Sequence, residues 1–151
     1  MVYGFQVVFD CADPPRVAEF WQQALGYVEE PVPHGFASWT EFLDRLNVPE
    51  SERDSIGSAV APDFDPATGH ASQPRLLFVR VPEGKTVKNR VHLDINAGGG
   101  RSVPPEERWP RVLARVAQLE ELGATRVREY NGKSSHHVVM TDPEGNEFCV
   151  H

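Results

Sequence analysis

A strand, a helix and a second strand follow one another twice along this 151-residue chain, and this repeat restricts the fold more than any other feature. In the first copy, β-branched and aromatic residues predict a strand over residues 5–11. Apolar residues at three- and four-residue spacing after Asp13 and Pro14 predict a helix that ends at Gly26. We expect residues 27–30 to be extended.

The second copy begins with a predicted strand over residues 91–95 and continues with a helix that begins at about Glu106 or Pro110 and ends at Leu122. Further strands are predicted over residues 57–61, 76–81, 125–130, 136–141 and 146–151. An internal duplication explains this order most simply. It predicts an α+β fold in which a single domain, residues 1–151, consists of two similar half-modules, about 1–84 and 85–151.

Charge and composition exclude several classes of protein. The formal net charge of −7 argues against nucleic-acid binding, which needs a basic face. No apolar run approaches the roughly 18 residues of a membrane span, and no charged and then apolar leader opens the sequence. Two cysteines are too few for a disulfide scaffold. These features predict a cytoplasmic protein that binds or converts small molecules.

Polar and apolar side chains alternate along the first strand of each copy and along the last strand of the chain. Because neighbouring side chains of a strand point to opposite faces, each strand has one apolar face and one face able to bind a ligand. The polar groups on that second face are Gln6, Asp10, His92, Asp94, Asn96, Glu147, Cys149 and His151. Solvent exposure is the simple alternative, but His, Cys and Glu are metal-binding and acid–base groups. We therefore expect them to line a shared hollow.

Individual residues on this face have structural alternatives. Cys149 is either a ligand or a small buried side chain, since a free thiol packs like an apolar group. His92 either serves as a ligand or acid–base group, or it lies in the core or at its rim. Only one of the adjacent His136 and His137 can face the hollow, and His137 is the candidate for ligand binding. Trp39, in a proline-rich segment, is a candidate for stacking on a ligand.

Two motifs at the ends of the chain resemble a known family. The opening QVVFDCADP from Gln6, with the later FW and ALGY, resembles the start of glyoxalase/bleomycin-resistance proteins of the vicinal oxygen chelate superfamily. The closing run TDPEGNEFCV from Thr141 resembles their final hairpin. The runs LFVRVPEGK and NRVHLD between them are similar to a glyoxalase-like subgroup of bacterial proteins. The resemblance covers nearly the whole chain and is loosest over residues 31–74.

This resemblance implies two βαβββ modules that form a curled mixed sheet around a central site, often in homodimers. Family enzymes hold a divalent metal with one ligand from each of four strands, and Gln6, His92 and Cys149 occupy three of these positions here. Cys149 replaces the usual Glu, and the strand at 76–81 contains no carboxylate. Zinc, nickel, manganese and iron are the candidate ions, with Glu147 and His137 available to rebuild the site; a metal-free site is the alternative.

Three functions follow from these observations. The first is a glyoxalase-like enzyme of lyase, isomerase or dioxygenase type, in which Gln6 and His92 hold a metal and Glu147 moves a proton. The second is a metal-free binding or drug-sequestering protein, like bleomycin-resistance members. The third is a regulatory or structural dimer without catalysis. In the first two, the residues expected to contact the small molecule are Gln6, Asp94, Trp39 and His137.

Overall fold

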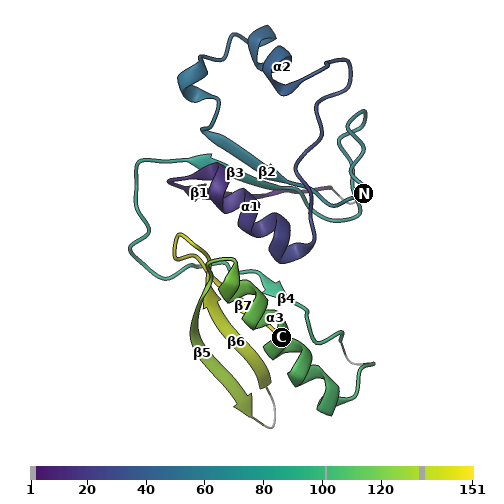
Figure 1. Ribbon diagram of the computed structural model, residues 1–151, viewed down its shortest axis with the longest axis vertical. Coiled ribbons are helices and arrows are strands. Elements are labelled where there is room, and N and C mark those ends of the chain that lie inside the picture. The colour runs from purple at the N-terminus through teal and green to yellow at the C-terminus, as the bar shows by residue number, and fades with distance from the viewer. Residues whose placement is uncertain (1–2, 101, 133–134) are drawn as a thin grey trace. The chain divides into compact units, whose positions relative to one another are not determined.

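The computed structural model describes residues 3–100, 102–132 and 135–151 (Figure 1). It divides into two compact units, residues 1–84 and 85–151, and each unit contains its own mixed sheet. Within the described residues, no helix is long and apolar enough to cross a membrane.

The first unit contains a three-stranded sheet and one long helix packed on it. Its elements are β1 (Val7–Cys11), α1 (Pro14–Leu25), α2 (Trp39–Arg45), a short 3-10 helix (Glu50–Glu52), β2 (Ile56–Ala59) and β3 (Leu76–Arg80). The strand order is β1-β3-β2, with β1 parallel and β2 antiparallel to β3. A single bridge joins Val28 to Val60, so the segment expected to be extended after α1 pairs at only one position.

Helix α1 begins and ends where its sequence predicts. The Asp13 carboxylate accepts a hydrogen bond from the N–H of Arg16 at 3.3 Å, which caps the first turn. Gly26 ends the helix in the left-handed conformation, with φ 67°, which glycine adopts without a steric penalty. The apolar side of α1 is buried, and Trp21 packs against Phe9 of β1 with ring centroids 5.2 Å apart.

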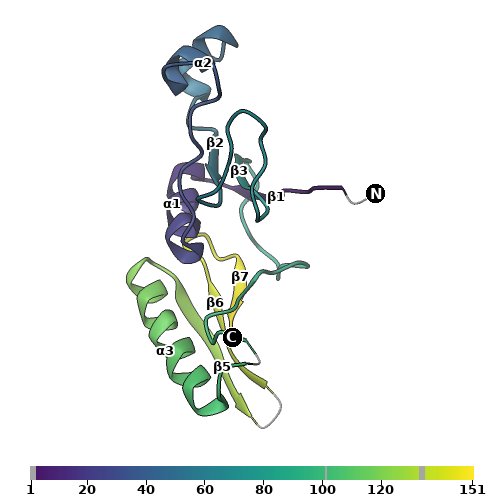
Figure 2. The same cartoon turned by 90° about the vertical axis from the view of Figure 1, so that its right-hand side faces the viewer.

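The second unit contains a four-stranded sheet covered on one face by a helix (Figure 2). Its elements are β4 (Asp94–Ile95), α3 (Pro105–Glu121), β5 (Thr125–Gly132), β6 (Ser135–Thr141) and β7 (Glu147–Val150). The strand order is β4-β7-β6-β5, with β4 parallel to β7 and the other pairs antiparallel. The sheet and helix bury Val112, Val116, Leu119, Val138, Met140, Phe148 and Val150.

Both units repeat one topology. In each, the strand that precedes the long helix pairs in parallel with the last strand of the unit, β1 with β3 and β4 with β7. The remaining pairs are antiparallel. This arrangement confirms the predicted α+β fold with mixed sheets and agrees with the duplication inferred from the sequence.

The turn between β6 and β7 lies in the run from Thr141 that resembles the family's final hairpin. The buried Asp142 carboxylate accepts hydrogen bonds from the N–H groups of Glu144 and Asn146, both at 2.9 Å. The Asn146 carbonyl in turn accepts the Asp142 N–H at 2.9 Å. These bonds hold the register in which Thr141 pairs with Glu147 and Val139 with Cys149.

Most predicted strands differ from the observed ones by one or two residues at an end, and the largest difference lies in the second unit. The strand expected over residues 91–95 is reduced to Asp94–Ile95, and the Val91 side chain is 77% exposed. The alternation of polar and apolar residues could not predict so short a strand, because its length depends on β7, which pairs with only two residues of 91–95. The second helix begins at Pro105 and continues through Pro110, so it starts slightly before the earlier of the two predicted positions.

Gly57 on β2 provides a test of helix–sheet packing in the first unit. A Cβ atom there would lie 2.7 Å from the Pro14 carbonyl oxygen and 3.0 Å from the Ala18 Cβ. Because backbone cannot move aside cheaply, Gly57→Ala should lower the free energy of unfolding by about 1–3 kcal/mol in urea denaturation. Gly84→Ala is the control, since a Cβ there meets nothing within 4 Å. Equal stability of the two variants would contradict the packing described.

Candidate functional site

Parallel pairing of β4 with β7 assembles the candidate site. The Cys149 N–H donates to the Leu93 carbonyl and the His151 N–H donates to the Ile95 carbonyl, both at 2.9 Å. In this register Asp94 lies directly beside Cys149. Residues more than fifty positions apart in the sequence therefore become neighbours.

The face opposite α3 carries the polar groups of this sheet. On β6 and β7, Val138, Met140, Phe148 and Val150 are buried toward the helix, so the alternate residues point the other way. We call this second side the open face, because no helix among the described residues of the unit covers it (Figure 2). Its members are Asp94, Arg128, Tyr130, His137, Val139, Thr141, Glu147 and Cys149.

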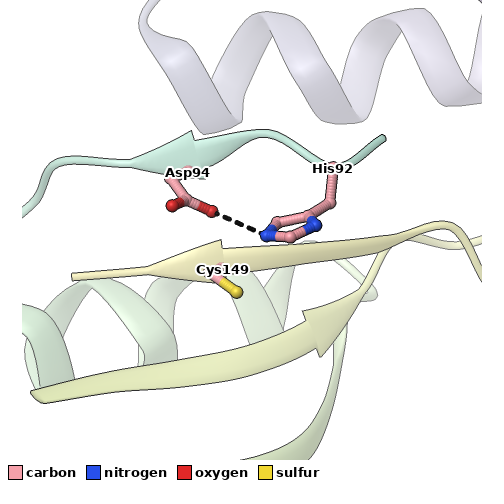
Figure 3. Close-up of side chains that lie close together, drawn as sticks. All are labelled: His92, Asp94 and Cys149. Atoms are coloured by element: carbon pink, nitrogen blue, oxygen red, sulfur yellow. Dashed lines mark ion pairs between the residues drawn. The ribbon is translucent and has the colours of Figure 1, made fainter. Parts of the chain in front are cut away.

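Three potential metal ligands gather at one edge of the open face. His92, Asp94 and Cys149 each offer a ligand atom, and these atoms all lie within 4.8 Å of one another. Figure 3 shows His92 and Asp94 on the β4 side and Cys149 on the neighbouring strand. The His92 Nε2 lies 3.3 Å from the Asp94 Oδ1, and both side chains are about half exposed. His92 and Cys149 are expected ligands, whereas the sequence predicts Asp94 only as a contact to the small molecule.

The electrostatic environment of Cys149 favours the protonated thiol. Burial, and after it the charge and hydrogen bond of Asp94, raise the pKa of Cys149 to about 11. A thiol beside a carboxylate is a weak nucleophile near neutral pH, because the thiolate is the reactive form. Without an ion, Cys149 is therefore poorly suited to nucleophilic catalysis, and a bound divalent ion would have to displace the thiol proton, because the thiolate is also the form that binds metals.

Glu147 lies on the same strand, but its carboxylate is already engaged. It accepts hydrogen bonds from the Lys85 Nζ at 2.9 Å and the Asn89 N–H at 3.1 Å, and Lys88 lies 4.0 Å away. The Lys85 hydrogen bond, followed by that from Asn89, lowers the pKa of Glu147 to about 2. Glu147 thus anchors the segment that leads to His92. The two lysines of that segment, Lys85 and Lys88, both form ion pairs with it.

The expected site residues of the first unit have partners of their own. The Gln6 amide oxygen, the atom that would bind a metal, accepts a hydrogen bond from the Arg75 Nη1 at 3.1 Å. The Trp39 ring packs on Phe42 with centroids 5.6 Å apart, and its Nε1 donates to the Glu30 carbonyl at 3.2 Å. Metal binding by Gln6 and ligand stacking by Trp39 both stay predictions.

The adjacent histidines on β6 face opposite ways. His137 stacks on Tyr130 of β5 on the open face, with ring centroids 4.5 Å apart and planes 18° from parallel. His136 lies near Trp109 of α3, with centroids 6.0 Å apart, and contacts Asn131. His137 thus occupies the face that carries the ligand cluster, although its contact to a small molecule stays a prediction.

Two features of the open face were missed by sequence reasoning. The first is the grouping of Asp94 with His92 and Cys149 as potential metal ligands, which its position two residues after His92 could have indicated. The second is Arg128, whose guanidinium carbon lies 4.7 Å from the centre of the Tyr130 ring. No sequence signal places Arg128 on this face, because a bulge interrupts the pairing of β5 between Arg126 and Arg128.

The chain belongs to the glyoxalase-like domain family, whose sequence pattern matches residues 6–151. The predicted resemblance to glyoxalase/bleomycin-resistance proteins is thereby confirmed. No curated protein sequence matches the chain.

Solved structures of low sequence identity share the fold. A glyoxalase/bleomycin resistance protein/dioxygenase family enzyme from Burkholderia phytofirmans is 16% identical, with a TM-score of 0.57 over 96% of this chain and 94% of that one. The fosfomycin resistance protein FosX from Mesorhizobium loti is 14% identical, with a TM-score of 0.56 over 100% and 92%. A mutant FosX from Listeria monocytogenes, complexed with Mn(II) and 1S,2S-dihydroxypropylphosphonic acid, is 11% identical, with a TM-score of 0.58 over 100% and 90%. The vicinal oxygen chelate fold is therefore confirmed.

The contact between Asp94 and Cys149 predicts a measurable thiol reactivity. In metal-free protein, alkylation of Cys149 by iodoacetamide should be slow at pH 8 and rise toward pH 11. Asp94→Asn removes the neighbouring negative charge, so the same rise should occur at lower pH. Peptide mass spectrometry follows Cys149 separately from the buried Cys11. An unchanged pH profile in Asp94→Asn would contradict the coupling.

Glu147 predicts a stability difference that depends on pH. Its pKa is lowered from 4.5 to about 2 in the folded protein, so its contribution to stability is present above pH 4.5 and is lost as the pH falls toward 2. Glu147→Gln should therefore destabilise the protein at pH 7 by about 1 kcal/mol, the scale of a charged hydrogen bond discounted for exposure. Denaturant unfolding from pH 7 to pH 2.5 should show this difference shrinking. A difference that stays constant with pH would exclude the ionised contact.

Proposed function

We propose that the open face of the second unit binds one divalent metal ion through His92, Asp94 and Cys149, and that the ion holds a small oxygen-rich molecule. The observation that carries the proposal is the presence of three different donor groups within 4.8 Å of one another. The Listeria FosX structure supports it, as a protein of the same fold that contains both Mn(II) and a dihydroxypropylphosphonic acid.

The donor set fits zinc better than it fits manganese or iron. Imidazole nitrogen, carboxylate oxygen and thiolate sulfur are all zinc donors, whereas thiolate is a poor partner for ions that prefer oxygen. One carboxylate and one thiolate also balance the charge of a divalent ion. Donor atoms around a tetrahedral zinc lie about 3–4 Å apart, so small side-chain rotations would close the cluster. Three protein donors leave a fourth position open for the small molecule.

The residues around the donors would position them. A bound zinc ion would supply Lewis-acid chemistry by polarising oxygen atoms of the small molecule. Glu147 holds Asn89, three residues before His92, and so restricts where the imidazole can lie. Hydrogen bonds from β7 to the Leu93 and Ile95 carbonyls fix the backbone on both sides of Asp94. Such support around a metal site sets the orientation of its ligands.

A zinc site favours lyase or isomerase chemistry over dioxygenase chemistry, because zinc has no redox activity. The sequence predicts that Glu147 moves a proton in such a reaction. Its pKa of about 2 makes it a weak base near neutral pH, and its hydrogen bonds already hold the Lys85–Asn89 segment. We therefore propose that Glu147 acts in anchoring rather than in proton transfer.

Metal content tests this proposal directly. Protein incubated with zinc and then dialysed should retain about one ion per chain by elemental analysis. His92→Ala, Asp94→Ala and Cys149→Ser should each weaken zinc binding at least about tenfold in competition with a chelating dye. His136→Ala is the matched control, because that histidine lies on the helix side of the same sheet. Equal zinc content in wild type and all three site variants would refute the proposal.

A metal-free binding protein is the second candidate, and one observation favours it. The His92 Nε2 lies 3.3 Å from the Asp94 Oδ1 and the Cys149 thiol is protonated, so these side chains contact one another without an ion. Under this function, small molecules would raise the melting temperature equally with and without a chelator, since selective binding to the native state stabilises it. Stabilisation lost on adding the chelator would support the metal-dependent function instead.

We also propose further properties for this chain that its sequence predicts. We propose that the two units form one domain and that the chain forms a homodimer in the cytoplasm, as its resemblance and composition predict. Metal binding by Gln6 stays a prediction, and its amide oxygen accepts a hydrogen bond from Arg75. Trp39 and His137 stay candidates for contact with the small molecule.

A further inference from the structure

Arg128 occupies the open face because of a β-bulge. Arg126 and Arg128 are two residues apart on β5 and would share one face of a regular strand. The register shift between them breaks this rule. Arg126 forms an ion pair with Glu120 of α3 at 3.0 Å, whereas Arg128 pairs in register with Val139 of the open face. Bulges often redirect a side chain beside a functional site.

Arg128 lies in the same cross-strand row as Asp94 and Cys149, two of the three potential metal ligands. Arg128 lies opposite Val139, Val139 opposite Cys149, and Cys149 opposite Asp94. Two strand spacings separate Arg128 from Cys149, which places their Cα atoms about 10 Å apart. A small molecule bound at the cluster and lying across β6 would therefore extend toward the arginine.

The guanidinium of Arg128 is held in place but keeps its hydrogen-bond donors. It lies over the Tyr130 ring, whose orientation is set in turn by stacking on His137. A guanidinium stacked on a ring presents its N–H groups at its edge, where they can bind an oxyanion in a bidentate manner. Among the described residues, no carboxylate forms an ion pair with Arg128, in contrast to Arg126 on the same strand.

We infer that Arg128 binds an oxyanion on the small molecule, so that the molecule carries an oxygen donor for the metal at one end and a carboxylate or phosphonate at the other. This inference rests on the proposed metal site for one end of the molecule. The Arg128–Tyr130–His137 stack supplies the other end. The substrate class is then a small acid with an oxygen donor at its far end, rather than a neutral diol or an uncharged aromatic.

Rigid probes that differ only in their acid group test the inference. Catechol offers only the two neighbouring oxygens, 3,4-dihydroxybenzoate adds a carboxylate at the far end, and 3,4-dihydroxyphenylphosphonate adds a phosphonate. In titration calorimetry with zinc-loaded protein, the better of the two acids should bind at least about tenfold more tightly than catechol, the scale of a charged bidentate contact. Comparison of the two acids identifies which oxyanion the site prefers.

Substitutions then assign the effect to one residue. In Arg128→Gln the two acids should bind no more tightly than catechol. The affinity for catechol, the zinc content and the melting temperature should stay unchanged. Arg126→Gln, on the helix side of the same strand, should keep the full advantage of the acids over catechol. Arg128→Lys should retain part of it, because the charge remains but the planar fork is lost.

The outcomes separate this inference from the proposed function. If zinc binds with normal stoichiometry but neither acid binds more tightly than catechol, the inference is overturned and the metal site stands. The same conclusion holds if the acids still bind more tightly than catechol in Arg128→Gln. Absence of zinc from wild-type protein would overturn the proposed function, and the two-ended ligand would fall with it.

Discussion

The pairing of β4 with β7 is the interaction on which the candidate site depends. Only two residues of β4 take part, yet hydrogen bonds to the Leu93 and Ile95 carbonyls fix the backbone on either side of Asp94. The Cys149 thiol is thereby brought beside the Asp94 carboxylate. Without this pairing, His92 and Asp94 would belong to an irregular connection after Lys85, and no donors would gather there.

The repeated order of elements was predictable because each part of it has a local cause. Asp13 caps the first helix, Gly26 ends it, and strand alternation separates the buried Phe148 from Cys149. The hairpin turn at Asp142 also lies in a run that resembles the family's final hairpin. These signals act within a few positions of the sequence, so they can be read without knowledge of distant contacts.

Other features depend on contacts that alternation cannot reveal. The length of β4 is set by how far β7 accompanies it, which leaves Val91 exposed. The pKa of Glu147 is lowered by hydrogen bonds from Lys85 and Asn89, which lie more than fifty positions away in the sequence. The bulge before Arg128 changes the face of every later residue of β5. In each case, contacts with residues that are distant in the sequence decide the outcome, and the local pattern does not.

The Asp142 turn has a consequence for how this chain can vary. Strand side chains alternate with a period of two, so a turn one residue longer or shorter would rotate the whole of β7. Phe148 would then face away from α3, and the sulfur of Cys149 would be enclosed beneath the helix. The length of this short connection therefore matters to the candidate site as much as the identity of His92, Asp94 and Cys149, and a loop one residue longer or shorter would separate these side chains although all three remained in the sequence.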